Sequence, residues 1–112
     1  MFMFGSQIPS VSVIDLKQAI DTKRKLFILD VRTPQEFSRG RIAGSVNLPV
    51  AQVKENVEQF IHDKDELIYV YCLSGSRSSV AVKNMIKLGY KNVYNVKNGL
   101  QAWQERHFAL KN

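Results

Sequence analysis

The sequence contains a single cysteine, Cys72, among its 112 residues. A lone cysteine excludes an internal disulfide, counts against a dithiol oxidoreductase and fits a reducing compartment. Histidine is almost as scarce. His62 and His107 lie in unrelated segments, and neither has the cysteine, histidine or carboxylate spacing of a metal site. The sequence therefore predicts no metal centre and no cofactor.

Long apolar runs are missing as well. No stretch approaches the roughly 18 apolar residues of a membrane-spanning helix. The apolar residues 1–4 are too few for the core of a signal peptide, and no basic segment precedes them. We therefore expect a cytoplasmic protein that does not bind membranes.

Repeats, low-complexity runs and linkers are absent, so we expect residues 1–112 to form one domain, with residues 1–8 as a loosely ordered extension. The net charge is +6, from 16 basic and 10 acidic side chains. The basic residues are scattered, and no aromatic-rich basic motif accompanies them. We interpret this charge as solvated surface and do not expect nucleic acid as a partner.

What the sequence does contain is an alternation of strand-like and helix-like segments. Runs of apolar, β-branched and aromatic residues predict strands at 26–31, 67–72 and 92–96, and weaker ones at 11–13 and 45–48. Helical spacing of apolar residues predicts helices at 14–21, 34–37, 50–61 and 78–88, and a last one from Leu100. This order indicates an α/β fold: a central, mostly parallel, five-stranded sheet with helices on both faces.

Ligands of such sheets bind beyond the carboxyl ends of the strands, which directs attention to Val31, Cys72 and Val96. Cys72 ends the most strand-like segment and precedes a short turn into a helix. A thiol attacks only as thiolate, and an unperturbed pKa of about 8.5 leaves roughly 3% ionised at neutral pH. Backbone N–H groups, the positive helix end and Arg77 would lower that pKa. The alternative is a buried structural cysteine, but the order of strand, cysteine, glycine-containing turn, arginine and helix favours a reactive one.

Residues 72–78, CLSGSRS, resemble the active-site loop of the rhodanese family, C-x-x-G-x-R-S. Three further segments match that family in the same order along nearly the whole chain. Residues 30–32 are similar to its D-V-R, residues 36–49 to its E-[FY]…G-H-I-P-G-A…N-[IL]-P stretch, and residues 99–103 to its closing G…A-W segment. The resemblance implies a single domain of rhodanese-like fold.

The resemblance also implies a sulfurtransferase that needs no metal or cofactor. Cys72 would be the catalytic nucleophile and would carry sulfur as a persulfide. Thiosulfate or a persulfide would donate the sulfur, cyanide or a thiol would accept it, and a protein donor or acceptor is possible. The loop that binds the substrate and the persulfide would consist of Leu73, Ser74, Gly75, Ser76, Arg77 and Ser78.

Loop length separates two chemistries that the resemblance allows. Four residues lie between Cys72 and Arg77, the length that the resemblance associates with sulfur transfer. The related cell-cycle phosphatases and arsenate reductases carry C-x5-R, and a tighter ring suits a sulfane sulfur better than a tetrahedral phosphate. Two departures from the family pattern stand out. Leu73 replaces a residue that is often basic or polar in members active on thiosulfate, and Asn98 replaces the first glycine of the closing pair.

Asp30, Arg32 and Glu36 are expected to support the site. Asp30 and Arg32 have an alternative interpretation as a strand-end ion pair and a surface charge. Arg77 is either an active-site cation or a brace to Asp30 or Glu36, because a buried arginine needs a carboxylate. Two alternatives to a thiosulfate-using enzyme also stay open: a persulfide-relay carrier with little thiosulfate activity, and a non-catalytic rhodanese module that only binds a partner.

Overall fold

The computed structural model describes residues 8–112. The predicted extension over residues 1–8 therefore falls almost wholly outside the described residues. Ile8, its one described member, packs against the hydrophobic core. Among residues 8–112, no helix has the length and apolar character needed to cross a membrane.

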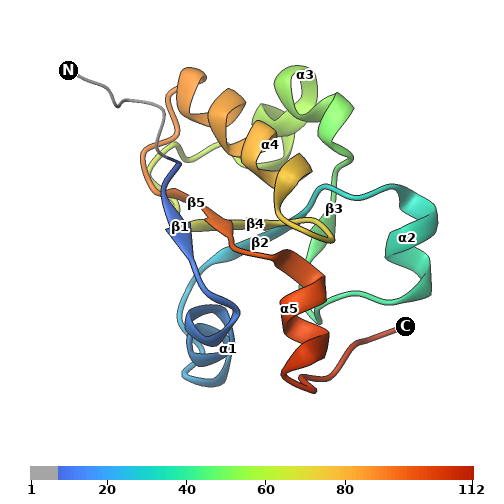
Figure 1. Ribbon diagram of the computed structural model, residues 1–112. Helices are drawn as coiled ribbons and strands as arrows, with labels where there is room; N and C mark the ends of the chain where they lie inside the picture. Colours follow the sequence, from blue (N-terminus) through green and yellow to red (C-terminus); the bar gives the residue numbers. More distant parts are fainter. Residues whose placement is uncertain (1–7) are drawn as a thin grey trace.

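Strands and helices alternate along the described chain (Figure 1). The strands are β1 (Ser10–Val11), β2 (Phe27–Asp30), β3 (Val46–Asn47), β4 (Ile68–Tyr71) and β5 (Val93–Val96). The helices are α1 (Val13–Asp21), α2 (Pro34–Arg39), α3 (Val50–Phe60), α4 (Ser76–Lys87) and α5 (Gly99–Glu105). The strands form one sheet in the order β1-β5-β4-β2-β3, and every neighbouring pair is parallel. The predicted α/β fold is confirmed, with a sheet that is entirely parallel.

Helices cover both faces of this sheet (Figure 1). Because side chains alternate along a strand, each strand contributes to two hydrophobic clusters. Leu29 and Val70 belong to the cluster beneath α3 and α4, whereas Ile28 and Tyr69 belong to the cluster beneath α1 and α5. The strands are therefore buried on both sides, which explains their nearly continuous apolar runs.

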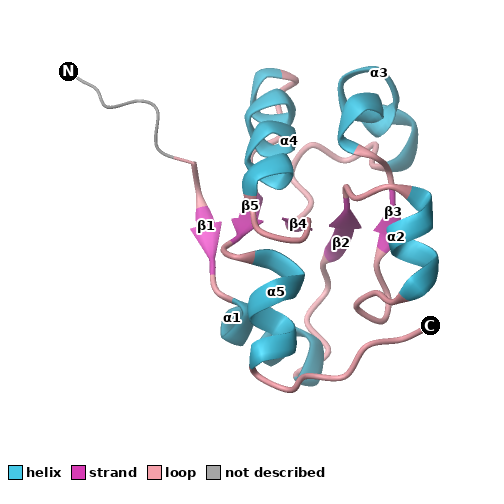
Figure 2. Ribbon diagram, turned by 45° about the vertical axis from the view of Figure 1, so that its right-hand side comes forward, coloured by secondary structure: helices cyan, strands magenta, loops and turns pink. Residues whose placement is uncertain are grey.

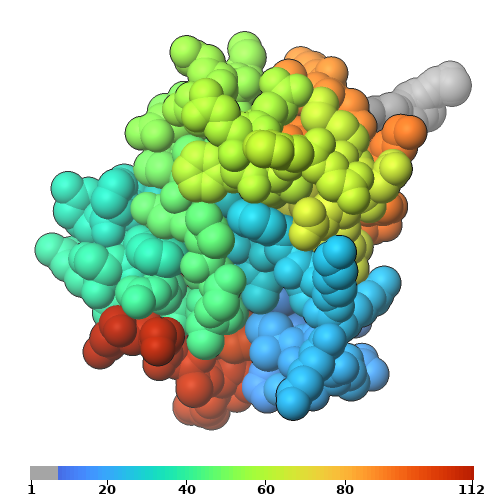
Figure 3. Space-filling model, turned by 180° about the vertical axis from the view of Figure 1, so that it is seen from behind, coloured from blue at the N-terminus to red at the C-terminus, as the bar shows by residue number. Residues whose placement is uncertain are grey.

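The short helix α2 lies to the side of these layers, near β3 (Figure 2). Its first turn is closed by a capping box, in which Thr33 Oγ1 accepts from Glu36 N and the Glu36 carboxylate accepts from Thr33 N. Pro34 occupies the first turn, as expected for a residue without an N–H group. Seen from behind (Figure 3), the C-terminal residues lie along the segment that follows α2. There Arg41 and Lys111 exchange two backbone hydrogen bonds of 2.9 and 2.8 Å.

Helix α4 begins at Ser76, two residues earlier than the sequence predicts. Gly75 precedes it with a left-handed φ of 105°, a conformation that glycine adopts without steric cost. This turn brings the chain into the helix at once. Ser76 and Arg77, which the sequence analysis places before the helix, therefore lie in its first turn, and the loop proper consists of residues 73–75.

Candidate active site

Cys72 directly follows β4 and is fully buried, with 0% of its surface exposed. Three hydrogen-bonding groups surround its Sγ atom. The Gly75 N–H donates to Sγ at 3.1 Å, the Ser78 N–H donates at 3.4 Å, and Ser78 Oγ lies 3.4 Å away. The turn and the first residues of α4 thus form a ring of polar groups around the sulfur.

Two opposing effects set the pKa of the Cys72 thiol. Burial is the largest single effect and raises the pKa, because it disfavours the charged thiolate. Hydrogen bonds from the Ser78 side chain and from the N–H groups of Ser78, Gly75 and Ser74 lower it. Together these bonds outweigh burial, so the pKa of Cys72 lies below its ordinary value. The ring therefore favours the reactive form of the cysteine.

The start of α5 holds the loop in this orientation. The Leu100 N–H donates to the Cys72 carbonyl at 2.9 Å, and the Gln101 N–H donates to the Leu73 carbonyl at 3.0 Å. In a trans peptide the C=O and the following N–H point in opposite directions. Turning these two carbonyls toward α5 therefore turns the N–H groups of Leu73 and Ser74 away from it, which agrees with the Ser74 N–H lowering the Cys72 pKa.

Gly99 permits this close approach. A Cβ atom at Gly99 would lie 2.2 Å from the Cys72 carbonyl oxygen, far inside contact distance. Gly99 has a φ of 45° and the preceding Asn98 a φ of 59°. Asparagine is one of the few side chains that adopts the left-handed region readily, so Asn98 keeps the turn that a glycine would give.

Arg77 braces the loop from the other side. Its guanidinium forms a two-point ion pair with the Glu36 carboxylate, at 2.8 and 3.1 Å. The Arg77 hydrogen bond is the largest influence on Glu36 and lowers its pKa to about 2, against a smaller opposing effect of burial. The partner of Arg77 is thus Glu36, one of the two carboxylates expected for a brace, and the role of Arg77 at the site stays a prediction.

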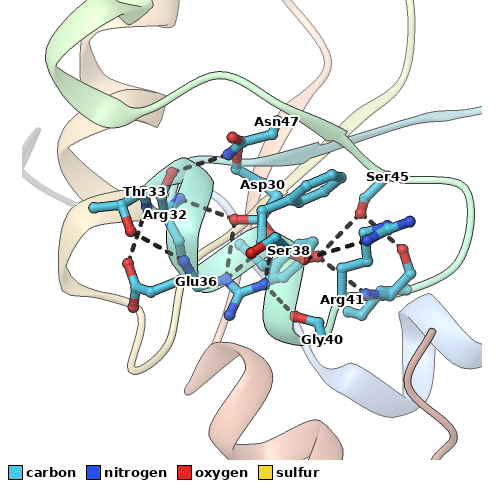
Figure 4. Close-up of polar contacts among 12 residues, drawn as sticks. Asp30, Arg32, Thr33, Glu36, Ser38, Gly40, Arg41, Ser45 and Asn47 are labelled. Carbon is cyan, nitrogen blue, oxygen red and sulfur yellow. Dashed lines mark hydrogen bonds and ion pairs between the residues drawn. The ribbon is translucent and has the colours of Figure 1, made fainter. Parts of the chain in front are cut away.

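Asp30 and Arg32 form a second, buried ion pair (Figure 4). Asp30 is 0% and Arg32 4% exposed, so Arg32 is not the surface charge that one interpretation predicted. Arg32 Nε and Nη2 donate to the Asp30 carboxylate, and Nη2 also donates to the Gly40 carbonyl at 2.7 Å. The side chain of Asn47 donates to both the Asp30 and the Arg32 carbonyls. This network ties the C-terminal end of α2 and the end of β3 to the end of β2.

An open pocket of about 230 Å³ lies beside the loop. Leu73, which is 42% exposed, forms part of its wall. Its other lining residues are Arg32, Glu36, Arg39, Gly40, Leu100, Gln104 and Leu110. The hydroxyls of Ser74 and Ser76 lie 3.3 Å from each other, and no hydrogen bond joins either hydroxyl to the sulfur in the described part of the chain. The pocket offers a ligand a mixed surface of apolar, basic and acidic groups next to the loop.

Asn95 is a site residue that the sequence analysis missed. It is 7% exposed and lies in β5 with its side chain beneath the loop, where its Oδ1 accepts from Ser78 Oγ. A sequence signal was present, because a polar residue facing inward in a buried strand needs a hydrogen-bonding partner. The alternation of β5 puts Asn95 on the same face as the buried Val93.

The fold and this site agree with the comparisons with known proteins. Residues 12–106 match the family model of the rhodanese-like domain. The chain therefore belongs to the rhodanese family. It is 39% identical over 99 residues to YrkF of Bacillus subtilis, a putative sulfur carrier protein; the match covers 88% of this chain and 52% of that protein. The chain thus spans only about half the length of this relative.

Two other proteins match over most of their length. YtwF of Bacillus subtilis, a putative sulfurtransferase, is 33% identical over 98 residues, covering 88% of this chain and 92% of that protein. The crystal structure of a rhodanese-related protein from Thermoplasma volcanium superimposes with a TM-score of 0.79 at 33% identity, covering 92% of this chain and 97% of the other. YtwF is named for sulfur transfer, and the Thermoplasma protein for its relation to rhodanese.

Proposed function

We propose that the chain transfers a sulfane sulfur from thiosulfate or a persulfide to a thiol or cyanide acceptor, through a persulfide on Cys72. The ring of hydrogen-bond donors around Cys72 Sγ carries this proposal. It lowers the pKa of the thiol, and it would stabilise the negative charge of a persulfide as an oxyanion hole stabilises oxygen. Cys72 serves as the nucleophile, and residues 73–78 bind the transferred sulfur.

The first half-reaction loads the cysteine. The Cys72 thiolate attacks the outer sulfur of thiosulfate and forms a new S–S bond. The original S–S bond of thiosulfate breaks, and sulfite leaves with the electron pair. With a persulfide donor the leaving group is the donor thiolate. Because Cys72 is fully buried, the attack requires the loop to move enough to admit the donor sulfur. Exposed Leu73 is the loop residue next to Cys72 that this movement would displace first.

The second half-reaction unloads the cysteine. Cyanide or an acceptor thiolate attacks the outer sulfur of the persulfide, the S–S bond to Cys72 breaks, and thiocyanate or a new persulfide leaves. The Cys72 thiolate is regenerated, so no oxidant, metal or base is consumed. Glu36 and Arg77 hold the loop, and Asp30 and Arg32 hold the segment around α2. These four residues position the site without touching the sulfur.

A persulfide-relay carrier is the second candidate, because YrkF is named as a putative sulfur carrier. The exposed Leu73 also favours this role, because an apolar side chain does not attract the thiosulfate anion as a basic one would. In this role a protein would supply or accept the sulfur at the pocket beside the loop. The cytoplasmic location and the absence of nucleic-acid and membrane partners stay predictions, as does the assignment of residues 1–112 to one domain.

Steady-state kinetics would separate the two candidates. Thiocyanate formation from cyanide would be followed with thiosulfate as the donor, and then with glutathione persulfide at matched concentrations. An enzyme that uses thiosulfate turns over with both donors. A relay carrier turns over with the persulfide and at least about tenfold more slowly with thiosulfate. The Leu73→Lys variant is the matched test of the exposed leucine, and we expect it to increase the rate with thiosulfate more than the rate with the persulfide. Because cyanide also reacts directly with persulfides, each rate is compared with that of Cys72→Ser. If the wild type is no faster than this variant with either donor, the non-catalytic module becomes the better description.

A further inference from the structure

Asn95 and Ser78 form a buried polar chain that ends at Cys72. Asn95 Oδ1 lies 2.5 Å from Ser78 Oγ, and Ser78 Oγ lies 3.4 Å from Cys72 Sγ. At its other end, Asn95 Nδ2 donates to Ser79 Oγ at 3.2 Å. Ser78 is 0% and Asn95 7% exposed, so these side chains depend on one another for hydrogen bonds rather than on water.

The Ser78 hydroxyl has only one hydrogen to donate. Three acceptors compete for it: Asn95 Oδ1 at 2.5 Å, the Gly75 carbonyl at 3.2 Å and Cys72 Sγ at 3.4 Å. The shortest of these bonds assigns the hydrogen to Asn95. Ser78 Oγ can then only accept a hydrogen from Cys72, which requires a protonated thiol. The observed arrangement of Asn95 therefore suits the thiol form. The hydrogen bond by which the Ser78 side chain lowers the pKa of Cys72 requires the other arrangement, in which the Ser78 hydroxyl donates to a thiolate.

Turning the Asn95 amide by 180° exchanges its donor and its acceptor. Nδ2 would then donate to Ser78 Oγ, and the Ser78 hydrogen would be free to donate to a Cys72 thiolate. Oδ1 would face Ser79 Oγ, whose hydrogen now goes to the Gly75 carbonyl at 2.7 Å. Ser79 could donate to Oδ1 instead, because the Gly75 carbonyl would keep the Ser79 N–H at 3.1 Å. In both orientations, Oδ1 and one N–H of Nδ2 thus have a hydrogen-bonding partner.

We propose that Asn95 is a positioning residue whose side-chain amide has two orientations, and that it acts through Ser78 to match the site to a thiol or to a thiolate at Cys72. The inference deepens the proposed function, which needs Cys72 as a nucleophile. Asn95 does not touch the sulfur. The two orientations of the amide differ in the direction of the hydrogen bonds among Asn95, Ser78 and Ser79.

A double-mutant cycle tests whether Asn95 acts through Ser78. The pH dependence of alkylation by iodoacetamide reports the pKa of Cys72 directly, because the chain has no other cysteine. Asn95→Asp presents only acceptors to Ser78 and also adds a charge, so we expect the pKa of Cys72 to rise by at least about one unit. In the Ser78→Ala background only the effect of the charge remains, so the same substitution should shift the pKa by less than about half as much. Equal shifts in the two backgrounds would overturn the proposal.

A measurement on the wild-type protein covers the case in which Asn95→Asp does not fold. The Asn95 side-chain amide signals in a nitrogen–proton correlation spectrum would be followed from pH 5 to pH 9. Because the amide changes its partner when Cys72 ionises, we expect its signals to titrate with the Cys72 pKa, and not to titrate in Cys72→Ser. Signals that stay constant in the wild type while Cys72 ionises would refute the proposed role of Asn95. Neither experiment depends on sulfur transfer. The proposed role of Asn95 can therefore fail while the proposed function stands, and the proposed function can fail while the role of Asn95 stands.

Discussion

Replacing Gly99 with alanine tests how α5 controls the loop around Cys72. The added Cβ would lie 2.2 Å from the Cys72 carbonyl oxygen and 2.8 Å from the Leu73 carbonyl oxygen. Both neighbours are backbone atoms, so the loop or the start of α5 must move by roughly 1 Å to reach ordinary contact distances. This movement would strain or break the hydrogen bonds from Leu100 and Gln101 to the same two carbonyls.

The expected loss of stability can be estimated from these parts. A non-glycine residue in the left-handed region costs roughly 1–2 kcal/mol. Two weakened backbone hydrogen bonds add about 1 kcal/mol each. The total is a decrease of about 3–4 kcal/mol in the free energy of unfolding. The N–H groups of Leu73 and Ser74 would also lose their fixed direction, so the pKa of Cys72 should rise toward its ordinary value.

Gly44→Ala is the matched control, because Gly44 has a φ of 87° and no atom within 4 Å of its added Cβ. It should cost only the backbone term of roughly 1–2 kcal/mol. Urea denaturation gives both free energies, and iodoacetamide alkylation over a range of pH gives the Cys72 pKa in each variant. If Gly99→Ala destabilises the protein no more than Gly44→Ala and leaves the pKa of Cys72 unchanged, the assigned role of α5 is wrong.

Two further predictions concern the ion pairs. The folded-state pKa of Glu36, about 2, lies below its ordinary value of 4.5. Its pair with Arg77 therefore contributes stability that is fully present above about pH 4.5 and is lost as the pH falls toward 2. Because both side chains are about one-third exposed, we expect a contribution of only about 1 kcal/mol. Urea unfolding should show a decrease in the free energy of unfolding from pH 6 to pH 3 in the wild type, and a smaller decrease in Arg77→Gln. An equal decrease in the two proteins would contradict the contribution of the ion pair. Asp30→Asn leaves the buried Arg32 without its counter-charge and should cost about 3–5 kcal/mol. A loss below about 1 kcal/mol, measured by urea unfolding at pH 7, would show that this pair is not needed.

Much of the fold could be predicted from the sequence because its strands are buried on both faces. The runs at β2 and β4 are almost entirely apolar, and a short turn after Cys72 leads into a helix with regular apolar spacing. In contrast, β1 and β3 each contain two residues, too few for a periodic pattern. Their place in the sheet follows from pairing with β5 and β2, which a local pattern does not contain.

The site was predicted only in part, because several of its contacts join residues that are far apart in the sequence. The position of Cys72 at the carboxyl end of a central strand follows from local order. The partner of Arg77 does not, because Asp30 and Glu36 are both near in sequence to the expected edge and only the tertiary structure selects Glu36. Asn95 was missed because its contact with Ser78 joins residues 17 positions apart. The early start of α4 depends on the left-handed Gly75, a backbone state that the sequence allows but does not require.

Intact-protein mass spectrometry tests the central claim, a persulfide on Cys72, most directly. Reduced protein would be incubated with thiosulfate, and separately with glutathione persulfide, weighed, treated with cyanide and weighed again, with Cys72→Ser as the control. We expect a gain of one sulfur atom, about 32 Da, on the wild type only, and its removal by cyanide. No added sulfur from either donor, or an equal gain on Cys72→Ser, would contradict the claim.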